Sequence, residues 1–146
     1  MRRLQGRKKK GTKRRTLVKN LDMYFSRYIR WSHADSDGNV KCITCDAVKH
    51  VKEMQCGHFM SRRYYSTRWL SNTKLSNCHP QCYGCNIGSQ GRQYKHSQYI
   101  DRTYGEGTAQ KIADRAELSR KYTNEELITL SNYYKKKVDE LCTKHC

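Results

Sequence analysis

Two Cys-x-x-Cys pairs, Cys42/Cys45 and Cys82/Cys85, are the residues of this chain whose types and spacing are most specific for chemistry. Four thiolates at these spacings form the usual ligand set of a structural Zn²⁺. Such a zinc is tetrahedral and leaves no coordination position open for a substrate. The sequence therefore predicts a zinc ion that holds the fold together, with the reactive groups elsewhere.

Three polar residues near the two pairs could supply those reactive groups. His58 lies between the pairs, Asn77 shortly precedes the second pair, and Asn86 directly follows it. A neutral imidazole can take a proton near pH 7, and a hard oxygen ligand suits a Mg²⁺ ion that bridges a phosphate. This layout predicts a phosphodiester-cleaving site held together by the zinc.

Each of the three residues also has a structural interpretation. His58 could be a hydrogen-bonded histidine beside the metal or a further metal ligand, and Asn86 could cap the helix that follows the second pair. We expect Asn77 to hold a loop rather than to touch a substrate. These alternatives leave the zinc prediction unchanged but are silent on activity.

The remaining cysteines have weaker patterns. Cys56 and Cys78 could complete a second metal site with His58 or His79, but we expect them to be buried thiols, the usual state of a free cysteine. Three residues with ligand-like side chains stand at a terminus that is expected to fray, and we assign them no function. They are Cys142, His145 and Cys146.

Composition limits the class of protein. The chain has 146 residues, of which 36% are apolar, so it has room for one domain with a small core that a metal would help to stabilise. Its 30 Lys and Arg against 13 Asp and Glu give a net charge of +17, which predicts a polyanionic partner. The sequence has no run long and apolar enough for a membrane span and no secretion signal, so we expect an intracellular protein with reduced cysteines and no membrane partner.

Two groups of cations are expected to bind DNA phosphates. Residues 1–16 have almost no apolar side chains and are expected to form a flexible basic arm. Its phosphate-binding candidates are Lys8, Lys9, Lys10, Lys13, Arg14 and Arg15. The second group, Arg62, Arg63 and Arg68, follows His58 closely in sequence.

Hydrophobic periodicity and turn residues predict one domain over residues 17–146. A helix is expected over 17–32, short strands over 40–44 and 51–59, and a loop over 61–76. A helix beginning near Pro80 is interrupted at Gly88 and Gly91 and ends at Gly105. Further helices are expected over 108–119 and from Thr123, which begins a capping box with Glu126, to Leu141.

This order of elements resembles the zinc-bound ββα-metal nucleases of the HNH class. The expected fold class is therefore α+β: a small zinc-stapled ββα-metal core, HNH-like or treble-clef-like, with flanking N- and C-terminal helices. The resemblance implies that His58 is the general base, that Asn77 braces the loop, and that Asn86 binds the catalytic ion, Mg²⁺ or Mn²⁺. One departure is Gly57, which stands where that class usually has an Asp that binds the ion. His58 itself, Glu53 or Asp101 could replace this ligand.

A closer resemblance runs from about Leu21 to Leu141 and concerns the NinG (Rap) recombination proteins of lambda-type phages. The strings that carry it are Phe25-Ser-Arg-Tyr-Ile-Arg30, Cys56-Gly-His-Phe-Met-Ser-Arg-Arg63, Thr67-Arg-Trp69, Asn77-Cys-His-Pro-Gln-Cys82, Cys85-Asn86 and Ile100-Asp-Arg-Thr-Tyr-Gly-Glu-Gly-Thr108. The resemblance implies a phage-encoded endonuclease that acts in the cytoplasm of a bacterial host. Its substrates would be branched recombination intermediates such as D-loops and Holliday junctions.

Three questions stay open at this level. A non-catalytic zinc module that binds nucleic acid would need only the basic arm and the cysteine pairs, and a sequence-specific homing or restriction nuclease would cut linear duplex. Symmetric cutting of a four-way junction would require two active sites and hence a homodimer. The apolar stripe from Leu127 to Leu141 could form that dimer surface or could pack internally.

Overall fold

The computed structural model describes residues 11–145, in which the first element is helix α1 (Arg14–Ser32). Its apolar side chains recur at steps of four residues, so that Leu17, Leu21, Phe25 and Ile29 are buried on one face. The helix begins at Arg14, three residues before the predicted start, because Thr16 N and Leu17 N already donate to the carbonyl of Lys13. Arg14 and Arg15 therefore belong to α1 and not to the predicted arm, whereas Lys8, Lys9 and Lys10 lie outside the described residues.

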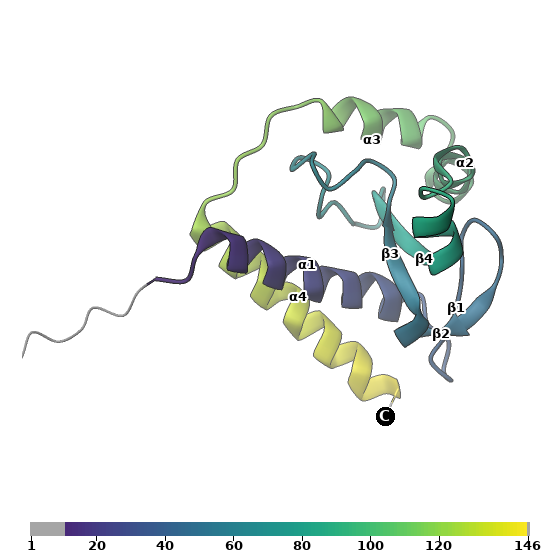
Figure 1. Ribbon diagram of the computed structural model, residues 1–146, viewed down its shortest axis with the longest axis horizontal. Helices are drawn as coiled ribbons and strands as arrows, with labels where there is room; N and C mark the ends of the chain where they lie inside the picture. Colours follow the sequence, from purple (N-terminus) through teal and green to yellow (C-terminus); the bar gives the residue numbers. More distant parts are fainter. Residues whose placement is uncertain (1–10, 146) are drawn as a thin grey trace, which may run out of the picture.

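The last helix, α4 (Asn124–His145), lies along α1 (Figure 1). The predicted capping box is present, since Glu126 N donates to Thr123 Oγ1 and Thr123 N donates to the Glu126 carboxylate. Tyr134 of α4 packs edge-on against Phe25 of α1, with ring centroids 5.0 Å apart. The stripe that begins at Leu127 thus packs internally rather than forming a free surface for a dimer.

Two small antiparallel sheets stand beside the helix pair. In the first, β1 (Asn39–Lys41) pairs with β2 (Val48–His50), and a short 3₁₀ turn, η1 (Val51–Glu53), follows. In the second, β3 (Met54–His58) pairs with β4 (Cys78–Cys82), with His58 opposite Cys78.

The segment around Pro80 was predicted to begin a helix, and this prediction is wrong. The segment forms β4 because its backbone pairs with β3, and the Pro80 carbonyl accepts a further hydrogen bond from Ile43 N at 3.1 Å. Proline is tolerated in this strand because its position needs an acceptor rather than a donor. Figure 1 shows β3 between α1 and β4.

Three helical segments follow β4. A π-turn, η2 (Gly84–Gly88), contains Cys85 and Asn86; helix α2 (Gln93–Tyr104) ends at Gly105 as predicted, and helix α3 (Thr108–Ala116) packs on α2. The chain is thus a small mixed α+β fold, as predicted. None of the described helices is long and apolar enough to cross a membrane.

Candidate functional site

The four cysteines of the Cys-x-x-Cys pairs form a single thiol cluster. Cys42 and Cys45 lie in the turn between β1 and β2, Cys82 ends β4, and Cys85 lies in η2. Their sulfur atoms all lie within 4.8 Å of one another, and Cys45 Sγ is 3.7 Å from Cys82 Sγ. A tetrahedral zinc with Zn–S bonds of about 2.3 Å separates its sulfur ligands by about 3.8 Å. The cluster can therefore hold a structural metal ion such as zinc, as the sequence predicts.

Two of the four thiols have pKa values that are shifted in opposite directions. Burial raises the pKa of the Cys42 thiol, but the Thr44 hydroxyl and nearby backbone N–H groups outweigh it and lower this pKa to about 6. The Ala47 N–H stabilises the Cys45 thiolate, yet burial and the three neighbouring thiols raise the pKa of Cys45 to about 12. One thiolate thus forms readily, and a metal ion would let the others ionise.

A cavity of about 630 Å³ runs along the edge of β3, between α1 and η2. It is lined by Asp22, Ser26 and Arg30 from α1, by Met54, Gln55, Cys56 and His58 from β3, by Asn86 and Ile87 from η2, and by Ser61, Arg62, Gln90, Gly91 and Gln93. A metal ion bound by the thiol cluster would fix one wall of this cavity, because Cys82 ends β4 and Cys85 lies in η2. His58 and Asn86, predicted as reactive groups, both line it.

His58 is held by a loop carbonyl. Its Nε2 lies 3.1 Å from the carbonyl oxygen of Arg68, which can only accept, so Nε2 carries the proton and Nδ1 keeps a lone pair. Burial lowers the pKa of His58 to about 4, and this outweighs the hydrogen bond to Arg68. The imidazole is therefore neutral at pH 7 and can act as a base or as a metal ligand.

Asn86 is held through its amide nitrogen. Asn86 Nδ2 donates to Gln55 Oε1 at 2.7 Å, which leaves Oδ1 as the atom available to a hard cation. Asn77 has a different surrounding. It is fully buried, its Oδ1 accepts from Met60 N at 2.7 Å, and its Nδ2 donates to the Met60 carbonyl at 3.0 Å. Asn77 thus holds the backbone of the loop after β3 and is not among the residues that line the cavity.

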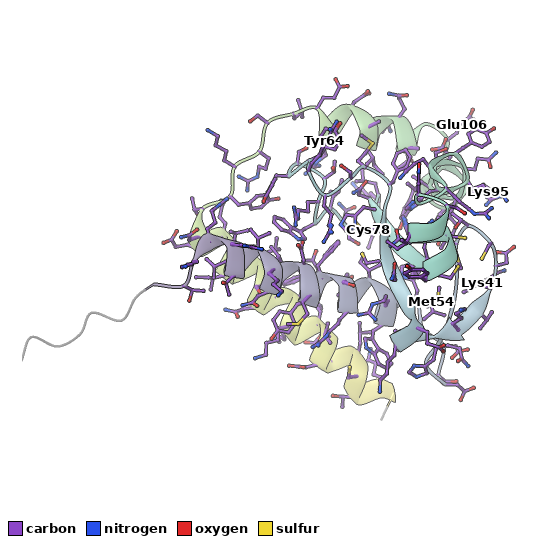
Figure 2. All side chains as sticks on the ribbon, in the orientation of Figure 1. Lys41, Met54, Tyr64, Cys78, Lys95 and Glu106 are labelled. Atoms are coloured by element: carbon purple, nitrogen blue, oxygen red, sulfur yellow. The ribbon has the colours of Figure 1, made fainter. Side chains whose placement is uncertain are left out.

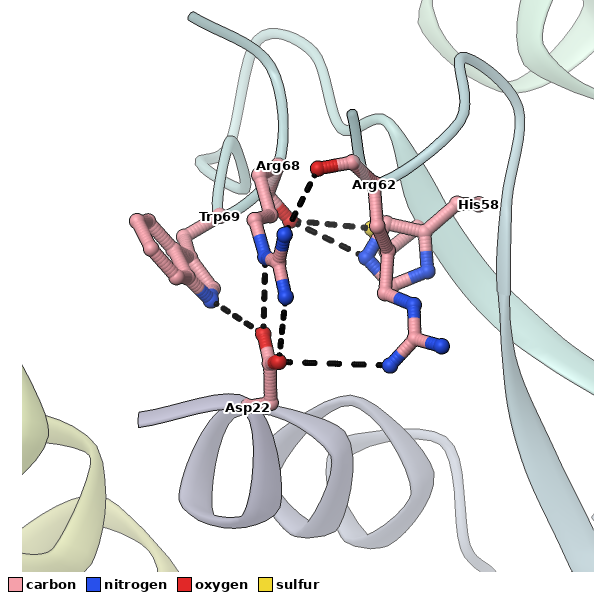
Figure 3. Close-up of polar contacts among 6 residues, drawn as sticks. Asp22, His58, Arg62, Arg68 and Trp69 are labelled. Atoms are coloured by element: carbon pink, nitrogen blue, oxygen red, sulfur yellow. Dashed lines mark hydrogen bonds and ion pairs between the residues drawn. The ribbon is translucent and has the colours of Figure 1, made fainter. Parts of the chain in front are cut away.

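Asp22 of α1 connects the helix to the loop that carries Arg62 and Arg68 (Figure 3). Arg68 donates to both carboxylate oxygens of Asp22, at 3.0 and 2.5 Å, and Trp69 Nε1 donates to Asp22 Oδ1 at 2.9 Å. Arg68 Nη1 also donates to the Arg62 carbonyl at 2.8 Å. The Arg68 carbonyl also accepts from His58 Nε2. Because Asp22 holds Arg68 in place, it helps to position the imidazole of His58.

These contacts correct one sequence-based assignment. Arg68 was expected to bind DNA phosphates, but its side chain is 13% exposed and its charge is paired with that of Asp22. Arg62 and Arg63 are exposed, and Arg62 lines the cavity. Phosphate binding stays a prediction for Arg62, which is 64% exposed although it lies 3.9 Å from Asp22, and for Arg63, whereas the Arg68 side chain is not available for it.

Comparison with protein families gives one match. The sequence model of the family described as Bacteriophage Lambda NinG protein matches residues 1–144. The chain belongs to the NinG family. Comparison with curated proteins and with solved structures gave no match.

For this NinG-family protein, the structure brings some of the predicted ion ligands into the cavity and leaves others out. Asp101 Oδ1 accepts from Ala109 N at 2.8 Å and thereby caps α3, and neither Asp101 nor Glu53 lines the cavity. Asp22 is the one carboxylate among the described residues that line it. No sequence signal indicated Asp22, because a single acidic residue on an amphipathic helix has no motif around it.

Two further residues that line the cavity were not identified from the sequence. Gln55 orients Asn86, and Arg30 places a guanidinium in the cavity while donating to the carbonyls of Val51 and Met54 at 3.0 and 3.4 Å. Arg30 ends the first string of residues that resembles the family, which is the only sequence signal that pointed to it. Of the three C-terminal residues with ligand-like side chains, Cys146 and the His145 side chain lie outside the described residues.

Proposed function

We propose that this NinG-family protein is a metal-dependent DNA endonuclease that cuts branched recombination intermediates by hydrolysing a phosphodiester bond. Membership of the family supports a role in phage recombination. The observation that carries the proposal is that His58, Asn86 and Arg62 line one cavity beside a thiol cluster that can hold a metal ion. A base, a hard oxygen ligand and a phosphate-binding cation are the groups that this hydrolysis requires.

His58 acts on the attacking water. Its Nδ1 lone pair accepts the proton while the Arg68 carbonyl holds Nε2–H, so the ring keeps one orientation through the reaction. The low pKa of His58 keeps this lone pair available throughout the neutral range. Arg62 and Arg30, which line the same cavity, bind the phosphate.

Asn86 Oδ1 would hold the catalytic ion together with the DNA phosphate. Magnesium and manganese ions take oxygen ligands and are often bound by few protein groups plus substrate phosphates, which suits a cavity with few acidic side chains. When bound, such an ion supplies stabilisation of the extra negative charge on the phosphate and on the leaving 3′ oxygen.

Recognition depends on backbone geometry rather than base sequence. The net charge of +17 and the exposed Arg62 and Arg63 favour many phosphate contacts, which carry no sequence information by themselves. A branched junction offers several phosphate backbones at once, so it provides more of these contacts than linear duplex.

The test is cleavage of labelled four-way junction, D-loop and linear duplex with Mg²⁺ or Mn²⁺ at matched zinc content. We expect the wild type to cut the branched substrates, and His58→Ala and Asn86→Ala to bind them without cutting. His50→Ala and Asn132→Ala are matched controls outside the cavity and should cut like the wild type. A wild type that binds junctions but never cuts would make the chain a non-catalytic binding module. Cutting of linear duplex at fixed sequences would instead indicate a sequence-specific nuclease.

A further inference from the structure

A second group of metal-ligating side chains lies on the face of β3 and β4 that packs against α1. Cys56, His58 and Cys78 have ligand atoms that all lie within 4.8 Å of one another. Cys56 and His58 are two residues apart on β3, so both side chains point to the same face, and Cys78 pairs with His58 across the sheet. The strand register thus brings the three residues together.

We propose that Cys56, His58 and Cys78 form a second site for Zn²⁺, whose fourth coordination position faces the cavity. Cys56 and His58 line the cavity, whereas Cys78, labelled in Figure 2, is fully buried and closes the inner side of the site. Thiolate and imidazole ligands favour zinc over magnesium. Three protein ligands with one open position differ from the closed four-thiolate cluster, which has no room for another group.

The distances suit a zinc ion. Sulfur ligands of a tetrahedral zinc lie about 3.8 Å apart, so ligand atoms within 4.8 Å would have to close by at most about 1 Å. The sulfur atoms of the four-thiolate cluster likewise lie within 4.8 Å of one another. The second site therefore needs side-chain adjustments and no change in strand pairing.

Neighbouring groups already orient two of the ligands. The Arg68 carbonyl accepts from His58 Nε2, which leaves Nδ1 as the nitrogen able to bind a metal ion. Asn77 Nδ2 donates to Cys78 Sγ at 3.8 Å, and the Cys78 thiol itself donates to the Arg68 carbonyl at 3.8 Å, a proton that zinc binding would release. Hydrogen bonds to the distal nitrogen of a histidine and to ligand sulfurs are a regular feature of metal sites, because they fix the orientation of each ligand.

Burial alone does not account for this group. A buried cysteine often acts as a small apolar side chain, which would explain Cys78. It would not explain why Cys56, on the wall of a polar cavity, stands beside an imidazole with an unused lone pair. A shared metal ion accounts for all three residues.

If the chain cuts DNA as proposed, zinc at this second site would affect the cutting. Zinc bound at Nδ1 takes the lone pair that His58 would use to accept a proton from water. Excess Zn²⁺ would therefore inhibit Mg²⁺-dependent cutting by the wild type, and Cys56→Ala would be less sensitive. The existence of the site does not depend on this consequence.

The deciding experiment counts zinc ions per full-length chain by elemental analysis after equilibration with buffered free Zn²⁺. We expect two equivalents in the wild type and in the Cys142→Ala control, and one in Cys56→Ala and Cys78→Ala. Cobalt substitution provides a second readout, because loss of one site removes part of the thiolate-to-cobalt absorption. Circular dichroism checks that each variant is folded.

Cys56→Ala decides the result if Cys78→Ala does not fold, because Cys56 is only half buried and its loss leaves a smaller gap in the core. One equivalent in the wild type, or two in Cys56→Ala, would overturn the proposal. A drop to one equivalent in Cys142→Ala would place the second zinc near the C-terminus instead. Absence of DNA cutting would contradict the proposed function but would leave the zinc count unaffected.

Discussion

The side-chain amide of Gln81 on β4 occupies the space in which a β-carbon at Gly57 would stand. Gln81 is fully buried, and its Nε2 donates to Thr44 Oγ1 at 3.0 Å and to the Gly91 carbonyl at 2.8 Å. It therefore cannot move aside without breaking both hydrogen bonds. Any side chain larger than that of glycine at position 57 would therefore collide with Gln81.

Gly57→Ala should lower the free energy of unfolding by about 1–3 kcal/mol, the usual cost of overfilling a packed site. Gly57→Asp should cost more, because it also buries a carboxylate. The control is Gly88→Ala, since a β-carbon at Gly88 would meet nothing within 4 Å. Urea unfolding of the zinc-loaded proteins measures the differences, and equal stability of Gly57→Asp and wild type would contradict the packing argument.

Removal of zinc should unfold the sheet region before the helix pair. Three of the thiol ligands, Cys42, Cys82 and Cys85, belong to a small apolar cluster that is separate from the core between α1 and α4. Chelation or Cys82→Ser should therefore abolish amide protection over residues 39–58 and 78–88 at zinc concentrations where α1 and α4 keep part of theirs. Hydrogen exchange read by mass spectrometry checks this, and uniform loss of protection would show one cooperative unit.

Asp22→Asn should destabilise the fold by about 1.5–3 kcal/mol, the range for hydrogen bonds to a charged group. The substitution removes the charge that pairs with Arg68, whose side chain is only 13% exposed. Asp46→Asn is the matched control, because Asp46 forms an exposed ion pair with Lys41 and should change stability by less than about 1 kcal/mol. Denaturant midpoints compare the two variants, and equal destabilisation would show that the pair with Arg68 has no special weight.

Acid should destabilise the fold through His96. Burial, with a contribution from His58, lowers the pKa of His96 to about 3, whereas the unfolded chain titrates near the ordinary value of 6.5. As the pH falls, the unfolded state binds a proton at His96 before the folded state does. The stabilising contribution of neutral His96 is therefore full above pH 6.5 and is lost as the pH falls towards 3. The slope from one such group is about 1.4 kcal/mol per pH unit.

His96→Gln should have a shallower loss of stability between pH 6.5 and 5 than the wild type. Unfolding midpoints at several pH values measure the slopes, with zinc content matched at each pH so that metal release affects both proteins alike. Parallel slopes would mean that His96 does not resist protonation in the folded state.

Deletion of residues 1–10 should weaken DNA binding and reduce its dependence on salt. The segment contains six Lys and Arg residues and ends before α1, so its removal leaves the described fold complete. For every phosphate that the segment neutralises, its deletion should reduce the slope of log affinity against log salt by about 0.9. Binding titrations to a junction at several salt concentrations measure this slope, and an unchanged slope would show that the segment does not bind DNA.

Local patterns in the sequence determined several features of this protein. The spacing of Cys42, Cys45, Cys82 and Cys85 specified the thiol cluster, and the capping box at Thr123 specified the start of α4. The recurrence of apolar residues over 17–32 specified the helix that the structure describes as α1. Each of these signals comes from residues close in sequence or from a ligand chemistry with few alternatives, which is why it could be recognised without a structure.

Contacts between distant segments decided the rest. β4 is a strand because β3 pairs with it, although Pro80 before a cysteine pair locally favours the start of a helix. Arg68 is neutralised by Asp22, 46 residues away, and the register of β3 and β4 places Cys78 beside His58. Pairing, charge neutralisation and shared ligand sites depend on which surfaces meet, and that is fixed only when the apolar faces of helices and strands are buried together.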